Sequence, residues 1–433
     1  MNEVGSDNVD ARDQAVFDVG SRSGRLRWTS LSSVGLAAGA STLACLIFIR
    51  MTAQGVGSDI MLHAAIARQE VADGRWFTYT LWSPLVMIVS ASGRLMSLRV
   101  ASVLLLTIAV AAKVTISRQL LQRWGTGPQA AVVCAAALVV ATPILAVGTP
   151  ALHGIVDVSS LRGSIYLGQF SATLWHNSTS IAALPLVLLA AAAARRALET
   201  PSARLSMQMG LWLAASVLMK PNYVLAALPV LFVWMFAVNR RQNQSTWGAT
   251  LRALAWCAVP SLAVLAVQFP LVRTDPFVEP SRFSWDPFVV WRYFTGSPFR
   301  SAVLSLAFPI AATVATLILR RRGQWWLWCC WLITAVAVVE LALLGERSRV
   351  TGELIYSGNW FWGTHAAVMV LFMASAAALA SATTHQGLSI RTPGMRTWQV
   401  AVVGAAWLVL GVHAASGGLY VWRLFHFEVG FAS

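Results

Sequence analysis

The amino-acid sequence predicts an all-α integral membrane protein with about eleven transmembrane helices. Three observations lead to this fold class. Hydrophobic residues make up 57% of the 433 residues and charged residues only 11%, so there is too little polar surface to cover a soluble domain. The apolar residues gather in runs long enough to cross a bilayer. Short arginine clusters and long loops alternate between these runs, a charge bias that orients membrane helices.

The predicted transmembrane helices extend through most of the chain. Each needs roughly 20 residues, with some allowance for tilt. We place them at residues 31–49, 100–121, 128–147, 180–194, 205–219, 223–238, 253–267, 302–319, 325–344, 361–382 and 400–414. We expect residues 1–30 to be a disordered cytoplasmic tail, residues 31–416 to form the transmembrane domain, and residues 417–433 to be an external tail.

The topology depends on the interruption at Lys220, which is followed by Pro221 between two apolar runs. If the chain reverses there, the N-terminus and all the basic clusters lie on the cytoplasmic side, whereas one continuous helix would place the later clusters opposite the earlier ones. The sequence therefore predicts a turn at Lys220. The residues assigned to the cytoplasmic side are Lys113, Arg118, Arg123, Arg195, Arg196, Arg204, Arg240, Arg241, Arg252, Arg320, Arg321, Arg322, Arg391 and Arg396.

Four long loops remain for the external side, at residues 51–99, 148–179, 270–300 and 345–360. Loops of this length are uncommon unless they are functional. In the first loop, Ser58 can cap a helix that runs from Asp59 to about residue 72 and stops at Gly74. We expect this helix to be amphipathic and to lie along the membrane surface. Residues 76–92 are too short for a span and are expected to be interfacial or re-entrant. The apolar face of the helix consists of Ile60, Ala64, Ala67 and Val71.

Asp59 is the first acidic residue after the first predicted span, and it shares a helix face with His63, four residues later. The partial positive charge at a helix N-terminus favours an ionised carboxylate. Such a carboxylate can act as a general base toward a hydroxyl group bound at the membrane surface. A simple helix cap explains the same residue, because Asp is favoured at that position.

The N-terminal half of the chain resembles the GT-C superfamily of integral-membrane glycosyltransferases. The resemblance lies in the first span, the Gly57–His63 segment that opens a surface helix, and the segments Gly74-Arg75-Trp76, Ser83-Pro84-Leu85 and Arg94–Val100. It implies that an acidic residue of the first external loop activates the acceptor. It also implies that the donor is a sugar on a polyprenyl phosphate, whose leaving phosphate is held by cations. Members often carry paired acidic residues, whereas Asp59 has no acidic neighbour, so use of a divalent metal stays open and no metal ligand is predicted.

A phosphate leaving group needs charge neutralisation more than it needs proton donation. Lys220 is the most specific candidate cation, because short interrupted helices commonly line membrane-embedded sites. An anchor that extends to the membrane interface is the alternative for this residue. The further cations expected to bind the substrate are Arg162, Arg282, Arg347 and Arg349.

The second external loop is the most polar and aromatic stretch of the chain. Its side chains can stack on a sugar or form hydrogen bonds to a sugar or pyrophosphate, although a helix cap explains Asn177 equally well. The predicted substrate-binding residues of this loop are Tyr166, Gln169, Trp175, His176 and Asn177, to which we add His63 and Asp286 from the neighbouring loops.

These features predict a glycosyltransferase of the bacterial cytoplasmic (inner) membrane that works on its external face. It would move a sugar from a polyprenyl-phosphate carrier to a glycan, lipid or protein acceptor, with Asp59 as base. A polymerase of lipid-linked polysaccharide repeat units is the alternative. A transporter of lipid-linked sugars fits less well, because Glu340 is the main charge within a span and no internal repeat is evident. Despite a net charge of +15, nucleic-acid binding is not predicted, because the basic residues lie in short clusters.

Overall fold

The computed structural model describes residues 23–53, 59–74, 80–144, 167–241, 247–274, 279–319, 324–356, 358–384 and 397–426. Within these ranges, eight helices are long and apolar enough to cross a membrane, and the number is nine if α12 (Pro298–Ser305) and α13 (Ala307–Ile318) form one span bent by 59°. The eight are α2 (Ser23–Ala53), α5 (Leu95–Arg123), α7 (Ser178–Glu199), α9 (Asn222–Arg241), α10 (Trp247–Thr274), α14 (Trp325–Leu343), α15 (Asn359–Thr384) and α16 (Thr397–His426). The chain is therefore a multi-pass membrane protein by helix length and composition.

Every predicted span contains a helix, but the described residues give eight or nine helices of full length, so they do not confirm the predicted number of about eleven spans. Two helices are short: α6 (Pro128–Val140) has 13 residues and α8 (Ala203–Met219) has 17. The predicted span at 302–319 is the bent pair α12 and α13. Two predicted tails are also partly helical, since α2 begins at Ser23 and α16 ends at His426. Residues 1–22 and 427–433 lie outside the described ranges.

Helix α6 ends at Val140, well before the predicted boundary at residue 147, and helix α16 binds the residues that follow it. From α16, Ser416 donates a hydrogen bond to the Pro143 carbonyl, and a His413 ring nitrogen lies 2.7 Å from the Thr142 carbonyl. Gly417 permits this close approach, since a Cβ there would lie 1.5 Å from the Val140 carbonyl oxygen. Side chains of α16 thus replace the helical hydrogen bonds of α6.

Lys113 was expected at the cytoplasmic surface, but it is buried inside the bundle. Its ammonium donates to the carbonyls of Leu138 and Ala172 and to the Thr173 hydroxyl, at 3.0–3.4 Å. These acceptors belong to the end of α6 and to the irregular segment 167–177, which is buried against α5 and α15. Non-helical backbone at this depth needs hydrogen-bond partners from the protein, and Lys113 supplies one to the Ala172 carbonyl.

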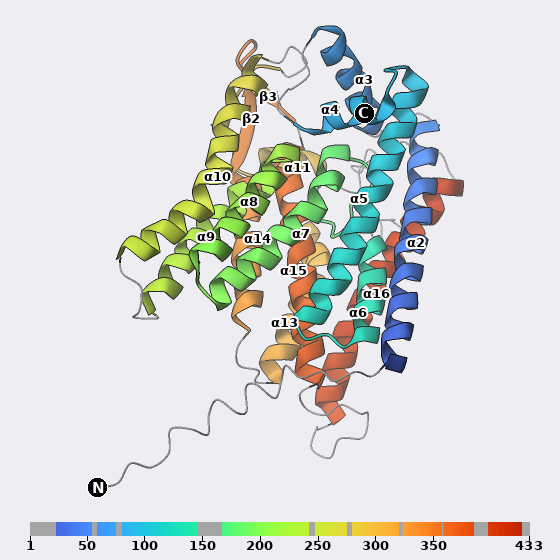
Figure 1. Cartoon of the computed structure of the whole chain (residues 1–433), viewed down its shortest axis with the longest axis vertical. Coiled ribbons are helices and arrows are strands. Elements are labelled where there is room, and N and C mark those ends of the chain that lie inside the picture. Colours follow the sequence, from blue (N-terminus) through green and yellow to red (C-terminus); the bar gives the residue numbers. More distant parts are fainter. Residues whose placement is uncertain are drawn as a thin grey trace.

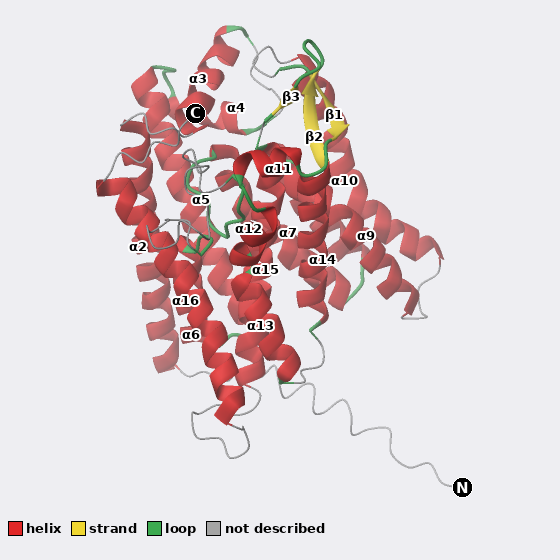
Figure 2. Ribbon diagram, turned by 180° about the vertical axis from the view of Figure 1, so that it is seen from behind, coloured by secondary structure: helices red, strands yellow, loops and turns green. Residues whose placement is uncertain are grey.

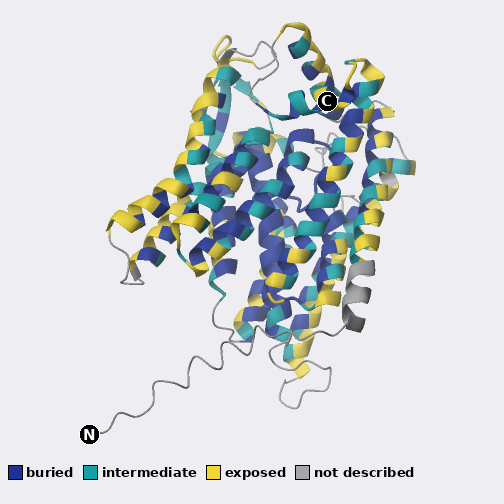
Figure 3. Ribbon diagram, viewed as in Figure 1, coloured by how far each residue is buried: buried dark blue, intermediate teal, exposed yellow. Residues whose placement is uncertain are grey.

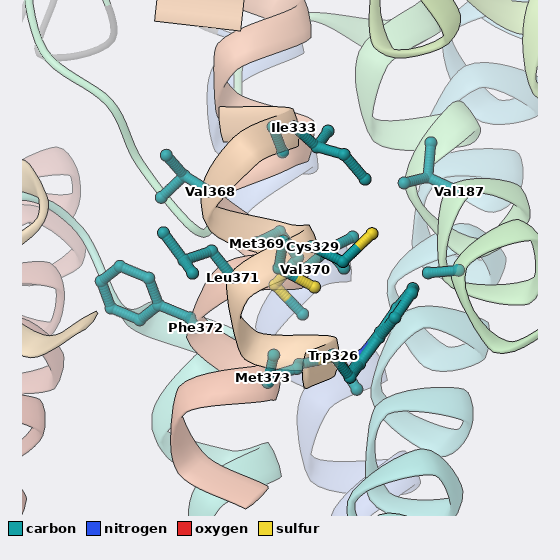
Figure 4. Close-up of a cluster of buried hydrophobic side chains, with 14 of the residues drawn as sticks. Val187, Trp326, Cys329, Ile333, Val368, Met369, Val370, Leu371, Phe372 and Met373 are labelled. Atoms are coloured by element: carbon teal, nitrogen blue, oxygen red, sulfur yellow. The ribbon is translucent and has the colours of Figure 1, made fainter. Parts of the chain in front are cut away.

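The hydrophobic core centres on α15, of which 89% is buried in its most apolar window. Figure 4 shows Val368 to Met373 of this helix among Trp326, Cys329 and Ile333 of α14 and Val187 of α7. In Figure 3, α7 and α15 are mostly buried, whereas α10 and α2 carry many exposed residues. Exposed apolar residues on the outer helices are expected where a protein faces lipid.

The two ends of the bundle differ in structure. At one end lie α3 (Asp59–Ala72), α4 (Trp82–Ser90) and a small sheet (Figures 1 and 2). The bounds of α3 match the prediction, and it stops at Gly74, whose φ of +73° favours glycine. At the opposite end, α5, α7 and α9 finish and α8 and α10 begin. That end carries Arg123, Arg195, Arg196, Arg204, Arg240 and Arg252.

The sheet was not predicted. It has the order β1 (Ser281–Trp285), β2 (Leu344–Ser348) and β3 (Leu354–Ile355), all antiparallel, and joins two loops far apart in sequence. Side chains alternate between the two faces of a strand. One face therefore carries Phe283, Glu346 and Ile355, which are directly opposite one another, and the other face carries Arg282 and Arg347.

Candidate functional site

The candidate site is built where the N-terminus of α3 meets the N-terminus of α7. The Asp59 amide donates to the His176 carbonyl at 3.2 Å, and the Asn177 side-chain amide donates to Asp59 Oδ2 at 2.6 Å. The Asn177 side-chain oxygen accepts from the Ser180 amide and so caps α7. Asn177 therefore caps the helix, which is one of its two predicted roles, and it also orients the candidate base, which was not predicted.

Lys220 lies at this same end, between α8 and α9. Pro221 lacks an amide donor and restricts the preceding residue, so α8 ends and Lys220 is extended, with φ −158° and ψ 117°. Two hydrogen bonds to neighbouring segments stabilise the turn. The Leu81 amide donates to the Leu218 carbonyl at 2.8 Å, and the Asn222 side-chain amide donates to the Asn359 carbonyl at 2.9 Å. The chain reverses here, as predicted.

The Lys220 ammonium has an unusual set of neighbours. It lies 5.8 Å from the centre of the Trp362 ring, a cation–π contact. Among the described residues it has no hydrogen-bond acceptor and no ion-pair partner at contact distance. Lys220 also lines a small pocket with Ser180, whose buried hydroxyl has no hydrogen-bond partner within the described ranges. An ammonium, a free hydroxyl and the first turn of α7 together favour an anion.

Two histidines complete this group, which we call the Asp59–Lys220 cluster: Asp59, His63, His176, Asn177, Lys220 and Trp362. The His176 and Trp362 rings lie 5.2 Å apart. Burial and the positive charge of Lys220 lower the pKa of His63 to about 4, although the Asp59 carboxylate opposes that shift. Burial also lowers the pKa of His176, again against the effect of Asp59. Both imidazoles are therefore neutral near pH 7.

Burial lowers the pKa of Lys220 to about 8, and the carboxylates of Asp59 and Glu346 oppose this effect. The amine is still mostly charged at neutral pH. This coupling also means that Asp59 and Lys220, 161 positions apart in sequence, act on each other electrostatically at one end of the bundle.

Glu346 was not predicted as a site residue. Its carboxylate accepts from the Asn359 side-chain amide at 3.1 and 3.2 Å, and Asn359 in turn is bound by Asn222. The alternation along β2 turns Glu346 toward α15 and Lys220, on the face opposite Arg347. The residue string Asn359 to Trp362, polar and aromatic at the start of the most buried helix, is the sequence signal that could have located this part of the site.

The predicted residues of the sheet form a separate group. Asp286 pairs with Arg347 through both carboxylate oxygens, and this bond holds the pKa of Asp286 below its usual value. Arg349 donates to the Ser281 carbonyl at 2.9 Å and is exposed, as is Arg282. None of these four side chains has a described contact with Asp59 or Lys220.

Other predicted residues lie in the core or outside the described ranges. Trp175 is buried against Phe48, with ring centres 5.9 Å apart, so it cannot offer a stacking surface to a sugar. Gln169 is buried in the irregular segment, and its side-chain oxygen has no hydrogen-bond partner among the described residues. Arg162 and Tyr166 fall outside the described residues.

The Asp59–Lys220 cluster can support one kind of chemistry well. It holds an oriented carboxylate, neutral imidazoles and a half-buried ammonium next to an aromatic ring, which suits proton removal beside an anion. No group of three or more His, Cys, Asp or Glu side chains suited to a metal ion occurs within the described ranges. Comparisons with models of protein families, with curated proteins and with solved structures give no significant match.

Proposed function

We propose that the protein is a membrane glycosyltransferase that moves a sugar from a polyprenyl-phosphate carrier to a hydroxyl-bearing acceptor. The observation that carries the proposal is the placement at one end of the bundle of the Asp59 carboxylate, held by Asn177, and the Lys220 ammonium, close enough to act on each other electrostatically and with no hydrogen-bond acceptor for Lys220 among the described residues. A base and an anion-binding cation are the two groups that such a transfer needs. Hydrolytic glycosidases instead use two carboxylates at a set separation.

In the proposed reaction, the acceptor oxygen forms a bond to the anomeric carbon while the bond between that carbon and the phosphate oxygen breaks. Asp59 takes the proton of the acceptor hydroxyl. The bond from Asn177 occupies Oδ2, and no described residue donates a hydrogen bond to Oδ1. Lys220 and the first turn of α7 stabilise the polyprenyl phosphate as it leaves. The neutral His63 and His176 can accept or donate hydrogen bonds without adding charge.

The proposed location is the external face of a bacterial cytoplasmic membrane. The helix ends opposite the cluster carry Arg123, Arg195, Arg196, Arg204, Arg240 and Arg252, while Arg282, Arg347 and Arg349 lie on or next to the sheet at the cluster end. The proposed orientation rests on the first group, because positive charge next to membrane spans favours the cytoplasmic side. The cluster would then face outward. Helices α3 and α4 would lie near the outer membrane surface, where a lipid-linked donor presents its phosphate.

The test is complementation of a deletion strain with the wild-type chain, with Asp59→Asn, or with Asp73→Asn, an exposed carboxylate just after the same helix, as a control. The deletion should remove one envelope glycan and accumulate its lipid-linked sugar. Wild type and Asp73→Asn should restore transfer, whereas Asp59→Asn should reduce it roughly 100-fold or more at equal membrane abundance. Full restoration by Asp59→Asn would refute the assignment of the base. Accumulation of whole repeat units on the carrier would identify a polymerase instead.

A further inference from the structure

Aromatic rings lead from the protein surface to the Asp59–Lys220 cluster. Tyr356 stacks on Tyr293 of α11 (Val289–Phe294), with ring centres 4.0 Å apart and an angle of 26°. Beside this pair, Phe283 of β1 lies 5.5 Å from Trp360 of α15. Trp360 is two residues before Trp362, which contacts Lys220. We call Phe283, Tyr293, Tyr356 and Trp360 the aromatic track.

The Tyr293–Tyr356 pair and the Phe283–Trp360 pair both connect to the first turn of α15. Phe294, next to Tyr293, packs edge-on against Phe361 at 5.7 Å. Both branches therefore meet in the first turn of α15, which also forms one wall of the cluster. The sheet and α11 hold the outer rings at the same end of the bundle as α3 (Figure 2).

The outer rings of the track are exposed, and its buried ring, Trp360, has a hydrogen-bond donor without an acceptor among the described residues. Phe283 is 65% exposed and Tyr293 is 58% exposed, which leaves aromatic surface uncovered next to the site. Trp360 is 8% exposed, and its indole N–H has no hydrogen-bond acceptor among the described residues. A buried donor without an acceptor is costly and needs an explanation. A ligand oxygen at this position would supply the acceptor.

We infer that the aromatic track binds carbohydrate, so that the acceptor is a glycan and not a protein or a lipid. The C–H faces of a sugar ring are apolar and pack on aromatic faces, while its hydroxyl rim needs hydrogen-bond partners. The track offers both, since the rings supply the faces and the Trp360 N–H supplies a donor.

This placement gives the glycan a direction. A chain packed along Tyr356 and Trp360 would end at the first turn of α15, the turn that also carries Trp362 beside Lys220. Transfer to a terminal hydroxyl of that chain rests on the proposed function. Binding of the glycan along the track does not, and it can be measured without any donor.

The experiment uses the full-length protein in lipid nanodiscs and isothermal titration with four probes: maltohexaose, cellohexaose, a chitin hexasaccharide and a galacturonic acid hexasaccharide. At least one should bind wild type. The double variant Tyr293→Ala, Tyr356→Ala should weaken that binding at least tenfold, and Trp360→Phe should weaken it severalfold by removing the N–H. Tyr356→Phe keeps the ring and should bind within about twofold of wild type. The control is Trp256→Ala, an exposed aromatic on α10, which should change nothing.

Two outcomes would overturn the inference. One is that no hexasaccharide binds in a way that depends on Tyr293 and Tyr356, or that a serine- and threonine-rich decapeptide binds there instead. The other is that the track lies in the bilayer interface, where aromatic side chains are also common. A bimane label on Tyr356→Cys would then be quenched by brominated lipids, whereas we expect it to stay accessible to aqueous iodide.

Failure of this inference and failure of the proposed function can be told apart. Retained transfer by Asp59→Asn would remove the proposed base while leaving oligosaccharide binding intact. Loss of transfer by Asp59→Asn, with no oligosaccharide binding to any variant, would keep the proposed transferase and reject the glycan acceptor.

Discussion

Two lysines of this protein, the buried Lys113 and the half-buried Lys220, have opposite surroundings. Lys113 donates to three oxygen atoms and thereby stabilises the end of α6 and the irregular segment 167–177. Lys220 has no such acceptor within the described ranges, and it borders a pocket, an aromatic ring and two carboxylates that act on it electrostatically. The difference suggests opposite roles, because a satisfied ammonium holds structure whereas an unsatisfied one is prepared for a ligand.

The comparison also bears on transport. An uncompensated charge deep in a helix bundle is typical of ion or proton pathways. Lys113 lies at such a depth, but its hydrogen bonds to backbone oxygens explain its position without any movement of charge. The chemistry of the described residues is instead concentrated at one end of the bundle, around Lys220.

The largest effect on transfer should come from Lys220→Met, which removes the cation but keeps much of the side-chain volume. We expect roughly a 100- to 1,000-fold loss of transfer, the effect of deleting one preorganised stabilising group. Thermal unfolding of the purified variant should stay close to wild type, because few contacts are lost. A variant with normal transfer would show that the unpaired ammonium is only a membrane anchor.

Lys113→Met should have the opposite effect, a loss of stability with little loss of transfer. It leaves the Ala172 carbonyl without its donor in a buried place, which costs about 1–3 kcal/mol, and it weakens the packing of segment 167–177. We expect a lower midpoint of thermal unfolding in nanodiscs, with transfer per folded molecule near wild type. Arg118→Met on the same helix is the control and should change stability by less than about 0.5 kcal/mol. Loss of transfer without loss of stability would show that Lys113 also acts in the reaction, and the assignment of a purely structural role to it would be wrong.

Much of the helical framework could be predicted from the sequence. Apolar runs located every long helix, and the bounds of α3 followed from Asp59 at its start and Gly74 at its end. The turn at Lys220 followed from Pro221 and from the charge bias. These features are local or depend on simple counting, so one sequence is sufficient to predict them.

The parts that were missed depend on contacts between distant segments. The early end of α6 depends on His413 and Gly417, more than 270 residues away. The sheet pairs residues 281–285 with residues 344–348, and only that register turns Glu346 toward the cluster and Arg347 away from it. No local pattern sets this register, so Arg347 was predicted in the site and Glu346 was not.

The pH dependence of transfer should separate the two lysines further. Because the pKa of Lys220 is lowered to about 8, its charge is present below that pH and is lost above it. Transfer should therefore fall about tenfold between pH 7 and pH 9 in wild type. Lys220→Arg keeps its charge at both values, so whatever activity it retains should show no such decrease. A wild-type profile that stays flat to pH 10 would contradict the role of the ammonium.

The smallest effect should come from Glu346→Gln, which tests whether the unpredicted carboxylate belongs to the cluster. The Glu346 carboxylate opposes the lowering of the Lys220 pKa, so its removal should lower that pKa further. The alkaline decrease in transfer should then move to lower pH by less than one unit, while the hydrogen bond to Asn359 can be kept by the new amide oxygen. Glu353→Gln, an exposed carboxylate between β2 and β3, is the matched control and should leave the profile in place. An equal shift in both variants would mean that the general negative charge of this hairpin acts on Lys220, and that Glu346 has no special position beside it.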